Sequence, residues 1–332
     1  PMLLLLIMIA VSAILNAVPI TEAILGTSLI LRFMLLFYVV LIRYPRKFWI
    51  KRLVIVILIM ASLQSLLGAS QVIFGENLNS FLLPSDGRTF SELQTMEASY
   101  WDPGLRVFGT MGHFDRLGAF LALAILLSLG FIYEGHRKLE WQKLGLFSLI
   151  AIPTLILTFS HSAWFGLILG GLAIAMVRKD KRVLVGAGVI VSLAVIVLAF
   201  TSPSMDLMNL SSQTLRDVAP HSITSAFFGV GPGQSSIDNS WLTLFSEIGI
   251  IGLVFYIWIY SMLVAVACKV ARSSKIAITR AVSAGYVGIS IAIALNAVLM
   301  TSLELRTLAP YLWILAGCVI VLGDREKLIS TR

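Results

Sequence analysis

The chain has 332 residues, of which 58% are hydrophobic and 13% are charged, and its mean hydropathy is +0.94. Soluble domains contain about 45–50% apolar and about 25% charged residues. The composition therefore excludes a soluble globular domain and predicts an integral membrane protein.

Apolar runs of about twenty residues, the length that a helix needs to cross about 30 Å of hydrocarbon, recur along the chain. They predict an all-α polytopic membrane protein with about ten transmembrane helices in one integral membrane domain, 1–332. The first run also fits a signal anchor, and a short turn at Ser160–His161–Ser162 separates two of the runs. The predicted spans are 2–18, 22–42, 53–74, 117–133, 144–160, 162–177, 183–201, 241–266, 281–301 and 308–323.

Basic residues cluster after every second predicted span, at 43–52, 137–143, 178–182, 269–280 and 325–332. This spacing is typical of cytoplasmic loops and predicts that both termini are cytoplasmic. These loops hold 19 of the 25 basic residues and five of the 17 acidic residues, which assigns +14 to the inner side and −6 to the outer side of the total of +8. The net charge thus reports topology and gives no indication of nucleic-acid binding.

Six arginines, and no lysine, remain for the outer half of the protein. A guanidinium binds phosphate in a bidentate manner and keeps its charge when partly buried, so we expect at least two of them to face an anionic ligand. The alternative for each is an ion pair with a nearby carboxylate, for example Arg116 with Asp115. The six are Arg32, Arg88, Arg106, Arg116, Arg216 and Arg306.

Two segments of about forty residues, 75–116 and 202–240, lie on the non-cytoplasmic side in this topology. The middle of the first, 88–101, has the composition of a short interfacial helix. Its end holds four polar or charged side chains within eleven positions, which suits a site, although an ordinary polar loop remains an alternative. They are Arg106, His113, Asp115 and Arg116.

The second segment contains glycines at 229, 231 and 233 around Pro232, a pattern that predicts a tight turn with exposed amides. Asp238, Asn239 and Ser240 fit the N-cap of the following helix. Glu247 lies about two turns into that helix, where an ionisable group is costly and indicates function by default.

Three motifs, in order between about residues 105 and 255, resemble the O-antigen ligase and polymerase superfamily. Arg106-Val-Phe-Gly109-Thr-Met-Gly112-His-Phe-Asp-Arg-Leu-Gly118 is similar to its R-x-x-G-x-x-x-x-P-N-x-x-G run, and Leu157-Thr-Phe-Ser160-His161-Ser162-Ala resembles L-T-x-S-R-S/G-A. The stretch from Gly229 to Gly252 resembles G-x-G-x-G … H-N-x-Y/L-L … E-x-G-x-x-G. His161 stands where the family usually has arginine, and Asp238 where it usually has histidine.

The resemblance implies a GT-C-like membrane glycosyltransferase of the bacterial inner (plasma) membrane. Such an enzyme transfers an oligosaccharide from undecaprenyl diphosphate to an acceptor hydroxyl on the non-cytoplasmic face, as a polysaccharide polymerase or an O-antigen ligase. It implies no metal or other cofactor, and other polysaccharide-assembly proteins as partners. Asp238 and Arg216 are then the expected catalytic residues, and the expected substrate-binding residues are Arg106, Arg116, His113, His161, Asn239 and Glu247.

Three other functions stay open at this point. A transporter or flippase of polyprenyl-linked glycans fits the predicted spans, although transporters are typically built from internal repeats, which are not evident in this chain. A peptidoglycan polymerase of the shape–elongation–division type shares the lipid substrate, and a non-enzymatic scaffold is the fourth reading.

Overall fold

The computed structural model describes residues 2–75, 78, 82, 106–132, 151–179, 223–235, 239–299 and 308–329. Within these ranges the regular elements are helices and none is a strand, so the predicted all-α fold is confirmed for this part of the chain. Residues 151–157 form a helical segment just before α8. The helices are α1 (Met2–Leu15), α2 (Ile20–Arg43), α3 (Lys47–Phe74), α6 (Phe114–Ile132), α8 (His161–Arg178), α11 (Ile223–Phe228), α12 (Ser240–Ser273), α13 (Ala277–Leu299) and α14 (Ala309–Arg325).

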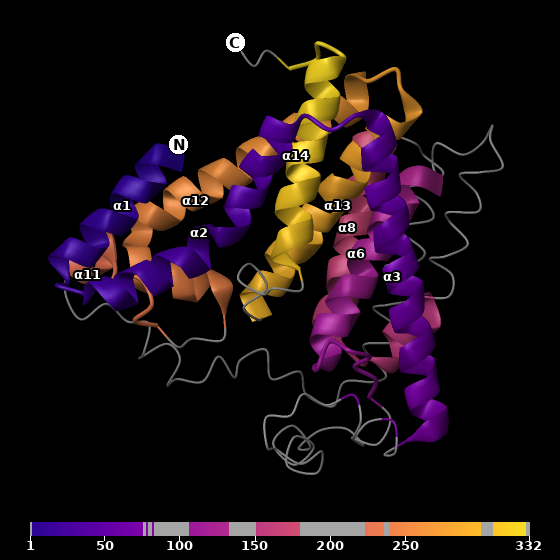
Figure 1. Ribbon diagram of the computed structural model, residues 1–332, viewed down its shortest axis with the longest axis horizontal. Helices are drawn as coiled ribbons and strands as arrows, with labels where there is room; N and C mark the ends of the chain where they lie inside the picture. The colour runs from indigo at the N-terminus through magenta and orange to yellow at the C-terminus, as the bar shows by residue number, and fades with distance from the viewer. Residues whose placement is uncertain are drawn as a thin grey trace.

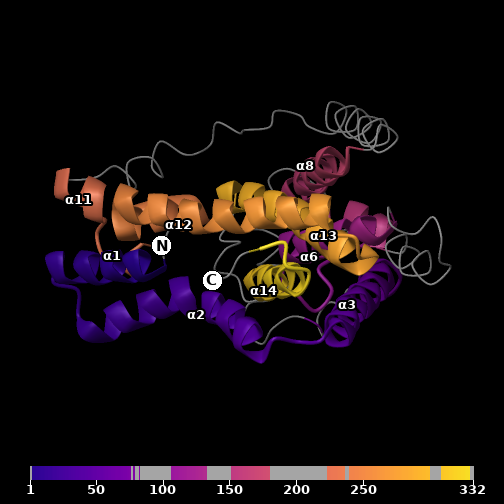
Figure 2. The same ribbon diagram turned by 90° about the horizontal axis from the view of Figure 1, so that it is seen from above.

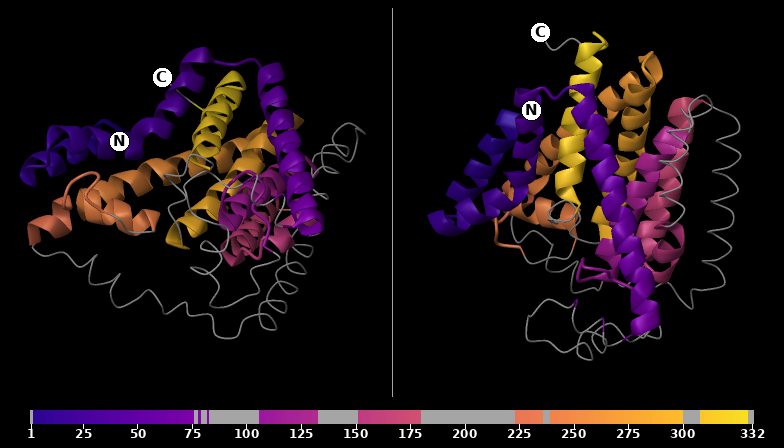
Figure 3. Two further views of the ribbon diagram at one scale, coloured as in Figure 1. Left: turned by 60° about the horizontal axis from the view of Figure 1, so that its bottom comes forward. Right: turned by 45° about the vertical axis from the view of Figure 1, so that its right-hand side comes forward.

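Five helices, α3, α6, α8, α13 and α14, run side by side and form a bundle (Figures 1 and 3). The helices α1 and α11, with the beginnings of α2 and α12, extend to one side of it. Seen from above, α1 and α11 lie at the opposite end of the molecule from α3 (Figure 2). The helix α12 connects the two parts, because it packs against α1 and α11 as well as against α13 and α14.

The core of the bundle is built around α6 and α13, with 78% of the most apolar stretch of each buried, against 17% for α2. Small residues allow α8 and α13 to approach closely. A Cβ atom on Gly170 would lie 2.6 Å from the carbonyl oxygen of Gly288, and one on Gly166 would lie 3.3 Å from that of Ala292. Such pairs, four residues apart on each helix, are the usual means of packing helices within a membrane.

Six of the described helices are long and apolar enough to cross a membrane: α2, α3, α6, α8, α12 and α13. They correspond to six predicted spans. The predicted turn between two spans lies at residues 158–160, two residues earlier than expected, because His161 and Ser162 already belong to α8. The helix α1 has 14 residues and rises only about 21 Å, so it is shorter than the span predicted at 2–18. The predicted span 183–201 and residues 144–150 lie outside the described residues.

Two helices are longer than their apolar runs. The helix α3 begins at Lys47, six residues before the predicted start, and α12 continues to Ser273, seven residues beyond the predicted end. Both extensions carry basic residues of the predicted inner clusters. Lysine and arginine side chains place their charge in water while the backbone stays helical, so the end of an apolar run does not mark the end of a helix.

The ends of the bundle differ in charge. The helices α6, α8, α12 and α14 begin, and α3 and α13 end, at the lower end in Figure 1. The opposite ends of these helices lie at the upper end, and there the described residues of the basic clusters gather. The upper end therefore has the character that the positive-inside rule assigns to the cytoplasmic side. The first glycine-punctuated motif, 106–118, lies at the lower end.

Candidate functional site

Two glutamines of α3 hold the loop that precedes α6. The Gln71 side-chain oxygen accepts hydrogen bonds from the backbone N–H groups of Phe108 (3.0 Å) and Gly109 (2.8 Å). Gln64 accepts from the Thr110 N–H (3.0 Å) and donates to the Thr110 hydroxyl (2.5 Å). The backbone of this loop is therefore satisfied by side chains of a neighbouring apolar helix, which orients Arg106 and His113 at either end of the loop.

The turn before α8 is fastened to the same loop. The Val107 N–H donates to the carbonyl of Leu157 (3.3 Å), and Thr154 donates to the carbonyl of Ser65 in α3 (3.0 Å). Gly118 in the first turns of α6 faces this turn, since a Cβ there would lie 2.8 Å from the Ser160 Cβ. The first two family-like motifs are thus adjacent in space.

Ser160 joins the two motifs directly. Its hydroxyl donates to the Asp115 carboxylate (2.5 Å) and accepts from the Ala163 N–H (3.4 Å) as the N-cap of α8. The Asp115 N–H donates to Nδ1 of His113 (3.2 Å). Because this nitrogen accepts, the proton of a neutral His113 lies on Nε2, and the 3.8 Å separation between Nδ1 and the Asp115 carboxylate is not an ion pair in that state.

Arg106 and His161 complete what we call the outer cluster: Arg106, His113, Asp115, Ser160 and His161. The Arg106 guanidinium lies 4.5 Å from the ring centre of Phe114. His161 lies close enough to interact electrostatically with both Arg106 and Asp115. The outer cluster combines a cation, a carboxylate and two imidazoles within one small region.

The Arg106 guanidinium keeps hydrogen-bonding capacity to spare. Its Nε atom is buried and, among the described residues, has no hydrogen-bond acceptor. The alternative in which Arg116 pairs with Asp115 is wrong, because the Asp115 carboxylate is hydrogen-bonded to Ser160 and lies beside His113, and no Asp115–Arg116 ion pair forms. Arg116 itself is partly exposed at the start of α6.

The third motif forms a second site, away from the outer cluster, where α12 is broken. Gly249 has φ 68° and ψ −177°, which is not helical. The carbonyls of Ser246 and Glu247 then accept from the N–H groups of Val230 (2.8 Å) and Gly231 (3.1 Å) of the glycine turn. The predicted turn is confirmed, but its amides are not exposed as predicted, because those of Val230 and Gly231 donate to α12. The turn thereby satisfies backbone groups that the break releases, as a break inside a membrane requires.

Helix α1 and the residues after it donate hydrogen bonds to this break and to the glycine turn. The Ser12 hydroxyl donates to the carbonyl of Glu247 (2.8 Å), and the Asn16 amide donates to the carbonyl of Gly229 (3.1 Å). The carbonyl of Glu247 thus has a structural role, because it accepts from both Ser12 and Gly231. The Glu247 side chain is buried, with 4% of its surface exposed.

Asn239 is the N-cap of α12, as predicted for this stretch. Its side-chain oxygen accepts from the Leu242 N–H (3.0 Å), and its amide donates to the carbonyl of Val298. Trp241 donates to the carbonyl of Ala294 (2.9 Å) and ties the same end of α12 to α13. Both functional groups of Asn239 are therefore used within the protein, which argues against a direct substrate contact.

The expected site residues therefore divide into three groups. The structure brings Arg106, His113 and His161 together, with Arg116 partly exposed near them at the start of α6, and it places Asn239 and Glu247 at the N-cap and in the first turns of α12. Asp238 and Arg216, the expected catalytic residues, lie outside the described residues. Asp115 was named only as one of the charged residues near the site, and Ser160 only as part of a motif and a turn; neither was given a role. The signal for both was their position at the beginning of a span, Ser160 directly before His161 and Asp115 two residues after His113.

In the part of the chain that the structure describes, no three His, Cys, Asp or Glu side chains gather as a metal ion would require. No protein-family model matches the chain, and a search of curated proteins finds no match.

Proposed function

We propose that this chain is a membrane glycosyltransferase that moves an oligosaccharide from an undecaprenyl-diphosphate carrier to an acceptor hydroxyl, as a polysaccharide polymerase or an O-antigen ligase. The observation that carries the proposal is the outer cluster. It comes from two motifs, each of which alone resembles the O-antigen ligase and polymerase superfamily, and they meet at one end of the bundle through the Ser160–Asp115 hydrogen bond.

In the proposed reaction, the acceptor oxygen attacks the anomeric carbon of the donor sugar. The bond from that carbon to the phosphate oxygen breaks, the diphosphate leaves on its lipid, and the hydroxyl proton passes to a base. Negative charge develops on the leaving diphosphate. The Arg106 guanidinium, which has a buried Nε–H without an acceptor among the described residues, is suited to stabilise that charge.

The imidazoles of the outer cluster support the same chemistry. A neutral imidazole donates one hydrogen bond through its N–H and accepts one through its other nitrogen. His161 can therefore take the place of the family's arginine and donate a hydrogen bond to a phosphate oxygen. The Asp115 carboxylate is oriented by its hydrogen bond from Ser160. Because a carboxylate repels a phosphate, Asp115 suits a place beside the acceptor hydroxyl better than one beside the diphosphate. We therefore assign Arg106 and His161 to the diphosphate, Asp115 to positioning, and the roles of base and second diphosphate ligand to Asp238 and Arg216.

The cellular setting belongs to the same proposal. We infer about ten spans, a bacterial plasma membrane, and both termini on the cytoplasmic side, from the predicted topology and from the basic residues at the upper end of the bundle. The outer cluster lies at the lower end, which is then the non-cytoplasmic face. A lipid carrier in the bilayer and a sugar in the aqueous phase can meet there.

The test is reconstitution of the purified full-length chain with an undecaprenyl-diphosphate oligosaccharide, with products followed by gel and mass spectrometry. Longer lipid-linked glycan identifies a polymerase, and sugar on an added lipid acceptor identifies a ligase. Arg106→Gln should lower kcat/KM about 10²- to 10³-fold, the usual effect of removing a donor to a developing charge.

The matched control is Arg52→Gln, because the Arg52 guanidinium also lies over an aromatic ring, 4.1 Å from the centre of Phe48, but at the basic end of the bundle. Transfer by Arg52→Gln should equal that of the wild type. If Arg106→Gln transfers sugar at the wild-type rate, the outer cluster has no role in the mechanism. Unmodified substrate carried across the bilayer would favour the transporter, for which the broken helix α12 is a structural argument.

A further inference from the structure

Helix α6 begins with a histidine in the position of an N-cap. His113, the residue before the helix, accepts the Asp115 N–H at Nδ1 (3.2 Å), and its carbonyl accepts the Leu117 N–H (3.2 Å). Serine, threonine, aspartate or asparagine usually fill this position. A hydroxyl or an amide caps a helix at any pH, whereas Nδ1 of an imidazole accepts a hydrogen bond only while it carries no proton. The side chain of His113 therefore caps α6 only in its neutral form.

A second arrangement is available to the charged imidazole. The Nδ1 atom of His113 lies 3.8 Å from the Asp115 Oδ2 atom, while the Asp115 Oδ1 atom accepts from Ser160. A proton on Nδ1 excludes the bond from the Asp115 N–H, because two donors then face each other, and turns the contact with Oδ2 into an ion pair. One proton thus exchanges the cap of α6 for a chain of contacts from His113 through Asp115 to Ser160 at the start of α8.

The charges around His113 determine what this proton does to the outer cluster. The helices α3 and α13 carry no charged side chain at their lower ends, within Lys47–Phe74 and Ala277–Leu299. In the outer cluster Arg106 and Asp115 offset each other, so a proton on His113 leaves one net positive charge. The charged or titratable described residues near His113 are Arg106 of the loop, Asp115 and Arg116 of α6, and His161 of α8.

We propose that a proton on His113 switches the outer cluster from a neutral to a positively charged state, in which it binds its anionic substrate more tightly. This inference rests on the proposed function, which places an anion at Arg106. Histidine changes its charge between about pH 5 and 8. Because the outer cluster lies on the non-cytoplasmic face in the proposed topology, the switch responds to the pH outside the cytoplasm.

The switch itself is tested by NMR of the full-length chain in detergent, with ¹⁵N in its histidine rings and backbone. The signal of His113 is identified with His113→Asn, in which an amide oxygen can cap α6 at any pH. We expect the neutral ring to carry its proton on Nε2, and the backbone amide of Asp115 to shift in the step in which Nδ1 gains a proton. A neutral His113 protonated on Nδ1, or an Asp115 amide unchanged through that step, would overturn the proposal.

Anion binding is measured by calorimetry of the same samples with sulfate, which stays a dianion over the pH range in which histidine titrates. The Kd of the wild type should fall about tenfold from about pH 8 to about pH 5, since one charge is added beside a dianion. His113→Asn should lose most of this change. His161→Gln should bind more weakly at both pH values and keep the change. The opposite result, a change kept in His113→Asn and lost in His161→Gln, would assign the proton to His161 and overturn the proposal.

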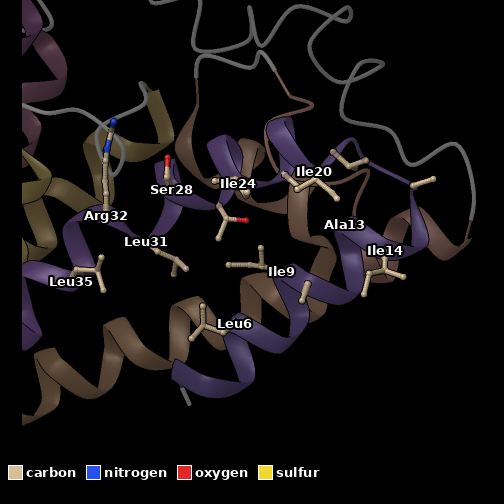
Figure 4. A pocket seen from close by; sticks show the side chains of 15 residues that line it. Leu6, Ile9, Ala13, Ile14, Ile20, Ile24, Ser28, Leu31, Arg32 and Leu35 are labelled. Atoms are coloured by element: carbon tan, nitrogen blue, oxygen red, sulfur yellow. The ribbon is translucent and has the colours of Figure 1, made fainter.

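Arg32→Gln is the control for sulfate bound elsewhere on the outer half. Arg32 lies beside the apolar groove between α1 and α2, and its side chain points away from α1 (Figure 4). This variant should bind sulfate with the wild-type Kd at both pH values. Loss of sulfate binding in Arg32→Gln would overturn the proposal, and so would a wild type that binds no sulfate at either pH.

Glycan transfer by the same samples separates this proposal from the proposed function. A wild type that transfers sugar but binds sulfate with one Kd at both pH values would refute the switch and leave the proposed function standing. A sulfate Kd that changes with pH through His113, in a wild type that transfers no sugar, would refute the proposed function and leave the switch as a property of an anion site.

Discussion

Substitution of Gly249 by alanine should destabilise the protein through the break in α12. With φ 68° and ψ −177°, Gly249 occupies a region that is nearly exclusive to glycine and costs other residues about 1–3 kcal/mol. An added Cβ would also lie 2.2 Å from the carbonyl oxygen of Phe227, so the contact between α11 and α12 must open. We expect a loss of at least about 3 kcal/mol.

At about 2 °C of Tm per kcal/mol for a chain of this size, Gly249→Ala should lower the Tm by about 6 °C or more. The assay is thermal unfolding of the purified protein in detergent, followed by size-exclusion chromatography. Gly171→Ala is the matched control, because Gly171 is in α8 with no atom within 4 Å of an added Cβ, and alanine favours a helix by about 0.5–1 kcal/mol. A Tm for Gly249→Ala equal to or above that of Gly171→Ala would refute the description of the break.

Three further substitutions test the contacts around the two sites. Ser160→Ala removes the bond to Asp115 and the N-cap of α8, and should lower the Tm by about 2–4 °C, since a cap contributes about 1–2 kcal/mol. Gln71→Leu leaves two buried N–H groups without their acceptor, at about 1–3 kcal/mol each, and should have the largest effect of the three. Trp241→Phe keeps a ring but loses the bond to Ala294, so a loss of about 1 kcal/mol is expected. All three are measured by the same thermal unfolding assay.

Ser160→Ala and Trp241→Phe each have a counterpart that changes the same kind of side chain without breaking a contact between helices. Ser261→Ala and Ser70→Ala remove hydroxyls that, within the described part of the chain, bond to carbonyls of their own helix. Trp258→Phe changes an indole that is 50% exposed at the edge of the bundle. Equal Tm losses in a variant and its counterpart would show that the contact between helices contributes nothing measurable.

Hydropathy predicted most of the described helices, because a membrane span needs about twenty apolar residues regardless of its neighbours. It did not predict the ends of α3 and α12, since these helices continue through basic residues. The break at Gly249 could not be predicted from hydropathy either. A single glycine in an apolar run says little by itself, and the break depends on the turn at Gly229–Gly231 that lies against it.

The outer cluster was predictable in part. The density of charged residues from Arg106 to Arg116 indicated a site, and so did the histidine at the turn before α8. The Ser160–Asp115 bond joins residues 45 positions apart and depends on how closely α6 approaches α8 at Gly118. The two glutamines of α3 were missed, although an amide side chain in an apolar span has to find a hydrogen-bond partner.

The bond from Ser12 to the carbonyl of Glu247 spans 235 positions of the chain. A ribosome that adds about 5–20 residues per second needs about 12 to 47 seconds between the two. For that time α1 and α2 exist without the helix and turn that hold them. The hairpin of α1 and α2 is therefore made well before the contacts that fix it in place. A chain that stalls before α12 is made should expose this hairpin to membrane proteases and insertion chaperones.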